Sequence, residues 1–401
     1  MANSKFDVVI AGGGIIGVAA AISIKQIDPG LSVAIFEKDY DYGLHASGRN
    51  SGVLHAGFYY SPDSLKAKFC VDGNMQLRKF AFDNDITVKE TGKVVVARDA
   101  KESLRLETLY ERGIANGVDV QLLDASDLVN FEPLAKTYEK FLWSPTTAVS
   151  NPHQIMKALI QKSRMLGIEL FSNRIVKISK DGNFLVDNQE IEYRHFINCA
   201  GVNSTKLARS FGLAQDYALV PFVGLYNYVD ATRIRLRTLV YPVPHEVNPF
   251  LGVHFTLTPN NEVKIGPTAI PVLGREQYKF LSTIKLTEIS ETIQGLYSLS
   301  KGDKHSLAQM ISSEVPKFFL KSLINEASTL VPSVKSIRGW KTKPPGIRAQ
   351  LVAKSNGALV QDFLIESGSN STHLLNAVSP GWTTALPFSD YVVREYVLPK
   401  L

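Results

Sequence analysis

The sequence has 401 residues, of which 45% are hydrophobic and 20% are charged, and its formal net charge is +6. This length exceeds the size at which a single hydrophobic core usually stops growing, so we expect two closely joined domains. The charges are scattered without a block of one sign, which excludes a nucleic-acid-binding arm, and no apolar run reaches the ~20 residues of a membrane span.

A strand, a helix and a second strand are predicted at the start of the chain. Residues 6–11 (FDVVIA) form a short apolar run that is followed by a glycine. Residues 15–27 are Ala-rich and apolar, which favours a helix, and residues 31–36 (LSVAIF) again have the character of a buried strand. This order makes a complete βαβ unit.

The turn inside this unit carries a dinucleotide-binding pattern. Gly12, Gly14 and Gly17 form G-x-G-x-x-G, in which the glycines allow a tight turn, the approach of a pyrophosphate and close packing of helix on strand. Glu37 follows the second strand about 20 positions after Gly17, where a carboxylate can bind ribose hydroxyls and repel the extra phosphate of NADP. FAD or NAD is therefore favoured. No second such pattern follows, so a single flavin that passes electrons to a non-nicotinamide acceptor is the simpler interpretation.

Four later stretches carry a family resemblance. Residues 45–70 (HASGRNSGVLHAGFYYSPDSLKAKFC) and 241–267 (YPVPHEVNPFLGVHFTLTPNNEVKIGP) resemble segments of the L-2-hydroxyglutarate dehydrogenase and oxidase family. Residues 345–352 (PGIRAQLV) and 375–388 (LNAVSPGWTTALPF) resemble the wider D-amino-acid-oxidase-like group of flavoproteins. The first two stretches are the specific ones. The resemblance implies FAD as the cofactor.

The resemblance also implies the fold. We expect an α/β protein with a discontinuous, Rossmann-like FAD-binding domain and an inserted α+β substrate domain that contains a β-sheet. The FAD-binding domain is expected to comprise residues 1–91, 150–216 and 335–401, and the substrate domain residues 92–149 and 217–334. Strand patterns occur in both sets of segments, at residues 174–178, 196–201, 94–97 and 252–257.

Oxidation of a secondary alcohol by hydride transfer to flavin needs a base for the hydroxyl proton. Histidine is suited to this because its unperturbed pKa of ~6.5 leaves it largely neutral near pH 7. His55 and His254 are the two histidines in the family-like segments, and the resemblance places both near the reactive face of the flavin. The alternative for each is a structural histidine that bonds a backbone carbonyl. Which of the two is the base stays open at this point.

A hydroxy-acid substrate also needs cations or hydroxyls for its carboxylates. The resemblance assigns Arg348 to a carboxylate, and its planar fork can bind one bidentately. For a second carboxylate the candidates are Tyr59, Tyr60 and Lys66. The alternatives are an ion-paired arginine, core tyrosines and a lysine on the surface of a helix.

Cofactor contacts are expected from the glycine turn, from a polar stretch after the second strand, from a central strand and from a C-terminal loop that begins at Ser379. The expected cofactor-binding residues are Gly12, Gly14, Ile15, Ile16, Gly17, Glu37, Lys38, Ser47, Arg49, Asn50, Ser51, Gly52, Val176, Ala200, Gly201, Gly346, Pro380, Gly381, Trp382 and Thr383. Val176 is the expected adenine contact. The family usually has histidine at the position of Arg49 and a small residue at that of Trp382. His45 resembles a flavin-linked histidine of related enzymes, which makes covalent attachment a minor alternative.

The predicted reaction is oxidation of a small 2-hydroxy acid, with L-2-hydroxyglutarate and its product 2-oxoglutarate as the leading pair and oxygen or a quinone as the final acceptor. One alternative is a flavoenzyme of the same group that oxidises an amino acid, an N-methyl amino acid or glycerol 3-phosphate. Another, of a different class, is a non-catalytic flavin-binding redox sensor. The presence of His55, His254 and Arg348 argues against the redox-sensor alternative.

The remaining features set the expected surroundings of the protein. Cys70 and Cys199 lie far apart with no CxxC pair or histidine cluster, so we expect neither a disulfide framework nor a metal site. The start of the sequence has no apolar or Arg-rich leader, which predicts a cytoplasmic location. The mild positive charge suits an acidic substrate or peripheral contact with an anionic inner-membrane surface. The sequence carries no signal for an oligomeric state.

Overall fold

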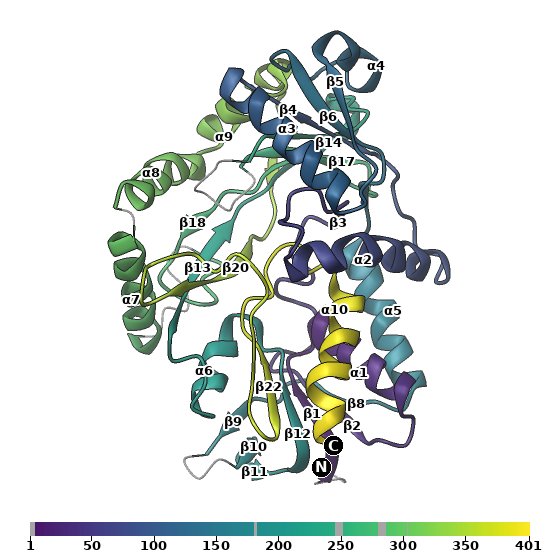
Figure 1. Ribbon diagram of the computed structural model, residues 1–401, viewed down its shortest axis with the longest axis vertical. Helices are drawn as coiled ribbons and strands as arrows, with labels where there is room; N and C mark the ends of the chain where they lie inside the picture. The colour runs from purple at the N-terminus through teal and green to yellow at the C-terminus, as the bar shows by residue number, and fades with distance from the viewer. Residues whose placement is uncertain (1–4, 180–182, 245–251, 280–285, 303) are drawn as a thin grey trace.

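The computed structural model describes residues 5–179, 183–244, 252–279, 286–302 and 304–401. Residues 245–251 of the second family-like segment therefore lie outside the described residues. Figure 1 shows two sheet-based layers, one at each end of the long axis, with a smaller sheet between them.

A six-stranded sheet contains the predicted βαβ unit. Its strand order is β21-β22-β12-β1-β2-β8, with all neighbours parallel except β21 and β22. These strands are β1 (Lys5–Ala11), β2 (Val33–Phe36), β8 (Glu169–Phe171), β12 (Glu192–Asn198), β21 (Ile365–Ser367) and β22 (Ser371–Leu374). Helix α1 (Ile15–Ile27) joins β1 to β2. The βαβ prediction is confirmed, and the sheet is assembled from segments far apart in the sequence.

Alternating side chains give this sheet two apolar faces. Val8 and Ile10 of β1 pack under α1, α5 (Pro152–Met165) and α10 (Ala385–Val392). Val9 and Ala11 face the opposite side, where an aromatic cluster supports a small sheet of β9 (Val176–Ile178), β10 (Phe184–Val186) and β11 (Gln189–Glu190). Burial on both faces is typical of parallel strands. It holds the glycine turn after β1 in a fixed place.

An eight-stranded sheet forms the other layer, in the order β19-β14-β17-β16-β15-β4-β6-β5. The β15–β4 pair is parallel and the other pairs are antiparallel. Its strands are β4 (Lys93–Val96), β5 (Gln121–Asp124), β6 (Lys140–Ser144), β14 (Asn227–Asp230), β15 (Leu239–Pro242), β16 (His254–Leu257), β17 (Glu262–Gly266) and β19 (Lys341–Thr342). Helices α3 (Ala100–Ala115), α4 (Leu128–Phe131) and α9 (Leu320–Ala327) contribute to the largest apolar core, which lies against this sheet.

A three-stranded sheet lies between the two layers in Figure 1. It consists of β13 (Tyr217–Gly224) with β18 (Ile270–Pro271) and β20 (Gly346–Ala353) as antiparallel neighbours, and α7 (Leu286–Gly302) packs on β13. The remaining elements are α2 (Leu65–Phe82), α6 (Ser204–Arg209), α8 (Lys304–Glu314) and the short pair β3 (Val53–Leu54) and β7 (Ala148–Val149).

The predicted α/β class is confirmed by this arrangement. The domain limits stay a prediction: β19 pairs with β14 in the eight-stranded sheet, although the predicted limits group it with the FAD-binding segments. Among the described helices, none combines the length and the apolar character that a membrane span requires.

Candidate active site

A cavity of about 750 Å³ opens at the carboxyl end of β1 and extends toward the eight-stranded sheet. Of the twenty residues expected to bind the cofactor, eighteen line this cavity. The two exceptions are Gly52 and Thr383. Both lie directly behind the wall: the Gly52 carbonyl accepts hydrogen bonds from Ser150, and the Thr383 hydroxyl accepts one from the His55 backbone at 3.0 Å. They hold the wall segment that carries His55.

The glycine turn leaves no room for side chains. Gly12 has φ +106°, and a Cβ there would lie 2.4 Å from the carbonyl oxygen of Cys199. A Cβ on Gly17 would lie 2.2 Å from the carbonyl oxygen of Gly12. These contacts let β1, α1 and the turn after β12 approach closely, and they leave a backbone-lined cradle at the start of α1 that suits a pyrophosphate.

We expect Gly17→Val to weaken FAD binding roughly ten- to 100-fold, because overpacking of ~1–3 kcal/mol must displace the turn or the helix. FAD titration of the apoprotein measures this change. Gly30→Val in the exposed loop after α1 is the control, since its nearest neighbour is the movable Asp28 carboxylate. Equal FAD affinity in the Gly17 variant and in wild type would contradict the assignment of the turn.

Glu37 and Ser47 fix the ends of this cradle. The Glu37 carboxylate accepts hydrogen bonds from the backbone of Gly13 at 2.8 Å and of Asp39 at 3.0 Å. Burial raises the pKa of Glu37 above its usual value. Ser47 Oγ accepts the backbone N–H of Ile15 at 2.9 Å, at the first residue of α1. The expected ribose contact of Glu37 stays a prediction.

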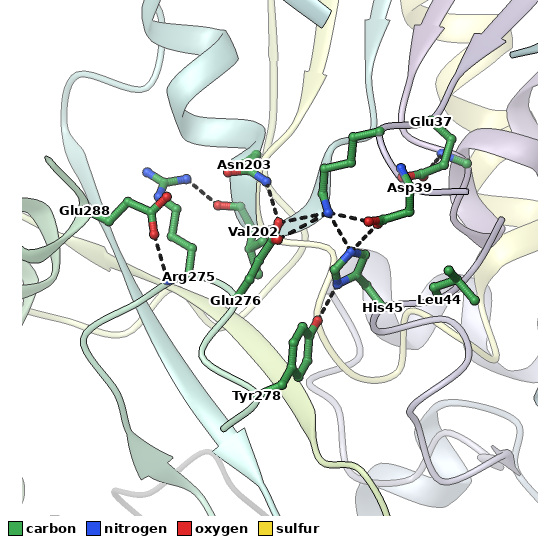
Figure 2. Close-up of polar contacts among 12 residues, drawn as sticks. Glu37, Asp39, Leu44, His45, Val202, Asn203, Arg275, Glu276, Tyr278 and Glu288 are labelled. Atoms are coloured by element: carbon green, nitrogen blue, oxygen red, sulfur yellow. Dashed lines mark hydrogen bonds and ion pairs between the residues drawn. The ribbon is translucent and has the colours of Figure 1, made fainter. Parts of the chain in front are cut away.

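Figure 2 shows a polar network at the rim of the same cavity. Lys38 Nζ lies 2.8 Å from Asp39, 2.7 Å from His45 Nε2 and 3.2 Å from Glu276. His45 Nε2 is 2.5 Å from Asp39, and its Nδ1 bonds the hydroxyl of Tyr278. Both nitrogens of His45 are thus engaged within the protein, which does not favour the covalent-attachment alternative. The network ties residues 274–278 to the loop after β2.

We expect Glu276→Gln to speed the release of FAD by about two- to fivefold, because a half-exposed ion pair contributes roughly 0.5–1 kcal/mol. The rise of flavin fluorescence after dilution of the holoprotein measures this rate. The matched control is Glu262→Gln, which removes the Lys343–Glu262 pair at the far sheet. An unchanged rate in the Glu276 variant would mean that the network does not close the cavity rim.

Arg49 supports this rim from the other side. Its Nε donates to the Leu44 carbonyl at 2.7 Å, its Nη1 donates to the Pro345 carbonyl at 3.2 Å, and its Cζ lies 4.1 Å from the ring centre of Tyr278. An arginine at this position therefore bridges two backbone segments and stacks on an aromatic ring, which histidine could not reproduce. Trp382 lies in the wall, where its Nε1 donates to Ser150 Oγ at 3.2 Å.

A smaller recess of about 50 Å³ adjoins the large cavity and shares several wall residues with it, including His55, Tyr226 and Arg348. His254 and Tyr241 line the recess but not the large cavity. The two predicted histidines and the predicted arginine therefore meet at one place, although they come from the loop after β3, from β16 and from β20.

His254 has a defined tautomer. Its Nδ1 lies 2.8 Å from the carbonyl oxygen of Gly252. Because a carbonyl only accepts, Nδ1 carries the proton and Nε2 of the neutral ring holds a lone pair. The ring stacks on Tyr241 with centroids 3.8 Å apart. Burial lowers the pKa of His254 to about 3, so the ring is neutral, and able to accept a proton, throughout the physiological range.

His55 is held through its backbone. Its N–H donates to Thr383, and its carbonyl accepts from Asn74 Nδ2 at 3.1 Å. Among the described residues, no side chain or backbone group bonds the buried Nδ1. Burial first, and then the charge of Lys93, lowers the pKa of His55 well below its usual value.

Arg348 lies on β20 opposite Phe222 of β13. Burial lowers its pKa, but a guanidinium stays protonated in proteins. The side chain thus brings a positive charge to the recess. Its neighbour Glu314 is a buried wall residue that already accepts the backbone N–H of Ala269 at 2.8 Å and pairs with Lys317 at 2.7 Å.

The other substrate-binding candidates lie outside both cavities. Tyr60 contacts Ser379, a wall residue, through a side-chain hydrogen bond. Lys66 sits on α2, with its ammonium 5.7 Å from the ring centre of Phe363. Tyr59 packs against Phe58. None of the three lines the recess, and their contact with substrate stays a prediction.

Several wall residues were not anticipated. Tyr226, Tyr241 and Glu314 line the recess. Lys264 lies beneath it, with Nζ 2.6 Å from the carbonyl oxygen of Ser51. Lys93 lies beside Tyr241. The two lysines carry a usable signal, because Lys93 begins the apolar strand KVVV and Lys264 interrupts the strand EVKIG. Each of them is fully or almost fully buried.

Comparisons with known proteins identify the family of this chain. A family model described as FAD dependent oxidoreductase matches residues 7–394. L-2-hydroxyglutarate dehydrogenase from Indibacter alkaliphilus is 34% identical over 98% of this chain and 99% of its own length. The human mitochondrial L-2-hydroxyglutarate dehydrogenase is 32% identical over 98% of this chain and 89% of its own.

Solved structures share the fold. The FAD-bound L-α-glycerophosphate oxidase from Mycoplasma pneumoniae has a TM-score of 0.74 at 22% identity, and the match covers 97% of this chain and 94% of the oxidase chain. Glycine oxidase from Geobacillus kaustophilus has a TM-score of 0.73 at 18% identity, and the match covers 100% of this chain and 96% of the glycine oxidase chain. These chains act on different substrates by name, so they speak for the fold alone. Together with the sequence relatives, the family match means that this chain belongs to the FAD dependent oxidoreductase family, and within it to the family of the L-2-hydroxyglutarate dehydrogenases.

Proposed function

We propose that this protein oxidises L-2-hydroxyglutarate to 2-oxoglutarate with bound FAD. The observation that carries the proposal is the recess beside the dinucleotide cavity, where a neutral histidine base and an arginine line the same small space. The named activity of relatives that are 32–34% identical over nearly the whole chain supports this substrate.

In this proposal each residue has one task. Arg348 binds the carboxylate next to the hydroxyl-bearing C2 and orients that carbon toward the large cavity. His254 Nε2 accepts the hydroxyl proton as the C2–H bond breaks, which leaves the ketone of 2-oxoglutarate. His55 lies beside it as the second candidate for this proton. When bound, FAD supplies the two-electron acceptor for the departing hydride.

The final acceptor is proposed to be oxygen or a quinone, and a quinone would place the protein at a membrane surface. Phe318 and Phe319, which precede α9, are 50% and 68% exposed and could contact the outer part of a bilayer. Sedimentation with anionic vesicles tests this: loss of binding in Phe319→Ser would support peripheral membrane contact, and equal recovery in the supernatant with and without vesicles would favour a cytoplasmic enzyme.

The deciding experiment mixes the holoprotein anaerobically with single substrates and follows loss of the visible flavin absorbance. We expect bleaching by L-2-hydroxyglutarate and none by its D-enantiomer, by amino acids or by glycerol 3-phosphate. Bleaching by an amino acid or by glycerol 3-phosphate instead would move the assignment to that substrate class. If none of these compounds bleached the flavin, the proposed activity would be refuted and the redox-sensor alternative would gain support.

A further inference from the structure

Lys264 is a buried lysine that joins the eight-stranded sheet to the wall of the large cavity. It lies on β17 and is 3% exposed. Its Nζ donates to the carbonyl oxygen of Ser51 at 2.6 Å and lies 5.0 Å from the ring centre of Tyr226. Ser51 and Tyr226 line both the large cavity and the recess. The side chain of Lys264 therefore contacts the residues at which the two cavities meet.

The partners of this lysine are uncharged. The Glu262 carboxylate of the same strand pairs with the exposed Lys343. Lys264 bonds a backbone carbonyl and faces two aromatic rings, those of Tyr226 and, at 5.9 Å, of Tyr228. Burying an amine costs free energy that an apolar side chain of similar size would avoid. Packing alone thus does not account for a lysine at this position.

At its base, Lys264 is fixed to the strand pair that carries His254. β17 pairs with β16, and Lys264 lies directly opposite Thr256. Side chains alternate along a strand, so His254, two residues before Thr256, points to the same face of the sheet as Lys264. His254 lines the recess. A shift of this strand pair relative to the cavity wall would therefore also shift His254.

At its tip, Lys264 bonds the segment that leads to His55. The carbonyl of Ser51 and the N–H of Gly52 belong to one peptide unit. That N–H donates to Asn50 Oδ1 at 2.7 Å, and Gly52 has the left-handed φ of +74°. The chain then passes through β3 and reaches His55. Lys264 and Asn50 thus hold the two ends of the peptide at which the wall turns toward His55.

We propose that Lys264 is a positioning residue that sets the distance between the strand carrying His254 and the cavity wall at Ser51. The inference rests on the proposed function, since it concerns the same site. Through this one hydrogen bond, the segment that carries His55 and the strand that carries His254 keep a fixed separation. The substrate carbon is held between them, facing the large cavity.

This task suits a hydrogen bond better than apolar packing. Apolar contact is non-directional, whereas an N–H···O bond fixes both a distance and a direction. Hydride transfer needs the reacting atoms about 3–3.5 Å apart, and a displacement of ~1 Å can lower the rate about 10²-fold. Burial lowers the pKa of Lys264 to about 7, but the ammonium and the neutral amine both carry N–H groups. The contact is therefore available on either side of neutrality.

The test compares the holoprotein of wild type with four variants. Lys264→Met keeps the length of the side chain but has no donor, and Lys264→Gln is a second loss variant because its shorter amide does not reach Ser51. Lys264→Arg retains N–H donors and tests for rescue. The matched control is Lys343→Met, which removes an exposed lysine whose Nζ lies 4.3 Å from the ring centre of Tyr228 on the same sheet.

Amide hydrogen exchange, followed by mass spectrometry without substrate, shows whether the wall is held. The amides of Gly52, Val53 and His55 are bonded to side chains of the wall, so peptides covering residues 50–58 report its opening. We expect exchange there to become about five- to thirtyfold faster in both loss variants, less so in Lys264→Arg and not in Lys343→Met. Strand β1 is the internal reference. Wild-type exchange at residues 50–58 in both loss variants would overturn the inference.

Anaerobic flavin reduction then shows whether the position matters for the reaction. The substrate is the compound that bleaches the wild-type flavin. We expect the limiting rate of both loss variants to fall about ten- to 100-fold and the half-saturating concentration to change less than about twofold, because Arg348 still binds the carboxylate. Lys264→Arg should recover part of the rate. A wild-type limiting rate in a loss variant with faster exchange would overturn the positioning role. If no compound bleached wild type, the proposed function would be refuted, while hydrogen exchange would still decide whether Lys264 holds the wall.

Discussion

Replacement of Arg348 by methionine is expected to lower kcat/KM for L-2-hydroxyglutarate by about 10²- to 10⁴-fold. Loss of one partner from a desolvated ion pair costs ~3–5 kcal/mol, and each 1.36 kcal/mol corresponds to a factor of ten. Most of the loss should appear as a higher KM, because the carboxylate is bound in the ground state as well as in the transition state. Steady-state kinetics with a dye acceptor measures both constants.

Two variants sharpen this prediction. Arg348→Lys keeps the charge but not the bidentate fork, so we expect an intermediate loss. Arg338→Met removes an exposed arginine that precedes β20 in the chain and should leave the kinetics unchanged. An Arg348→Met enzyme with wild-type KM would show that the substrate carboxylate is bound elsewhere.

Replacement of His254 by glutamine is expected to lower the rate of flavin reduction by about 10²- to 10⁴-fold, the usual contribution of a general base. Glutamine removes the basic Nε2, and bound FAD should remain. Anaerobic stopped-flow absorbance measures this rate. Because the pKa of His254 is lowered to about 3, the base is in its active, deprotonated form above that value. Its titration should therefore not limit the wild-type rate at pH 6 to 8.

His55→Gln is the necessary comparison, and His153→Gln on the exposed start of α5 is the control. The defined tautomer of His254 leads us to expect the larger loss there. A greater loss in His55→Gln would make His55 the base and His254 its neighbour. Little loss in either single variant would indicate that the proton leaves by another route.

The parts of this protein that could be predicted from sequence are those set by local rules. Gly12 and Gly17 sit where a strand, a turn and a helix meet within thirty or so residues, and each step is dictated by neighbours in the chain. Eighteen of twenty expected cofactor residues line the cavity; those of the glycine turn follow from this local pattern, and others, such as Val176, follow from the family resemblance. Gly52 and Thr383 lie behind the wall, and a loop pattern does not tell which side of a wall a residue occupies.

The recess could be predicted only in part. His254, Tyr241 and Lys93 meet because β16, β15 and β4 pair, and strand order across a hundred and fifty or so residues is not written in any local pattern. For Tyr59 and Lys66 the difficulty is that their directions could not be predicted from the segment that contains them. They lie in a recognisable segment, but Lys66 on α2 points toward Phe363, and the Tyr59 ring lies against the ammonium of Lys93. A family-like segment identifies the neighbourhood of a site without giving side-chain directions.

The assembly of the six-stranded sheet has a consequence for biosynthesis. β12 is complete at residue 198, but its outer neighbour β22 and the wall residues 378–382 are made much later. Since chains emerge from the ribosome with the N-terminus first, the apolar edge formed by Phe196 and Ile197 must wait unpaired while more than a hundred and fifty further residues are added. An unpaired strand edge is prone to association. The cavity wall is therefore complete, and this edge is covered, only after that later segment has been made.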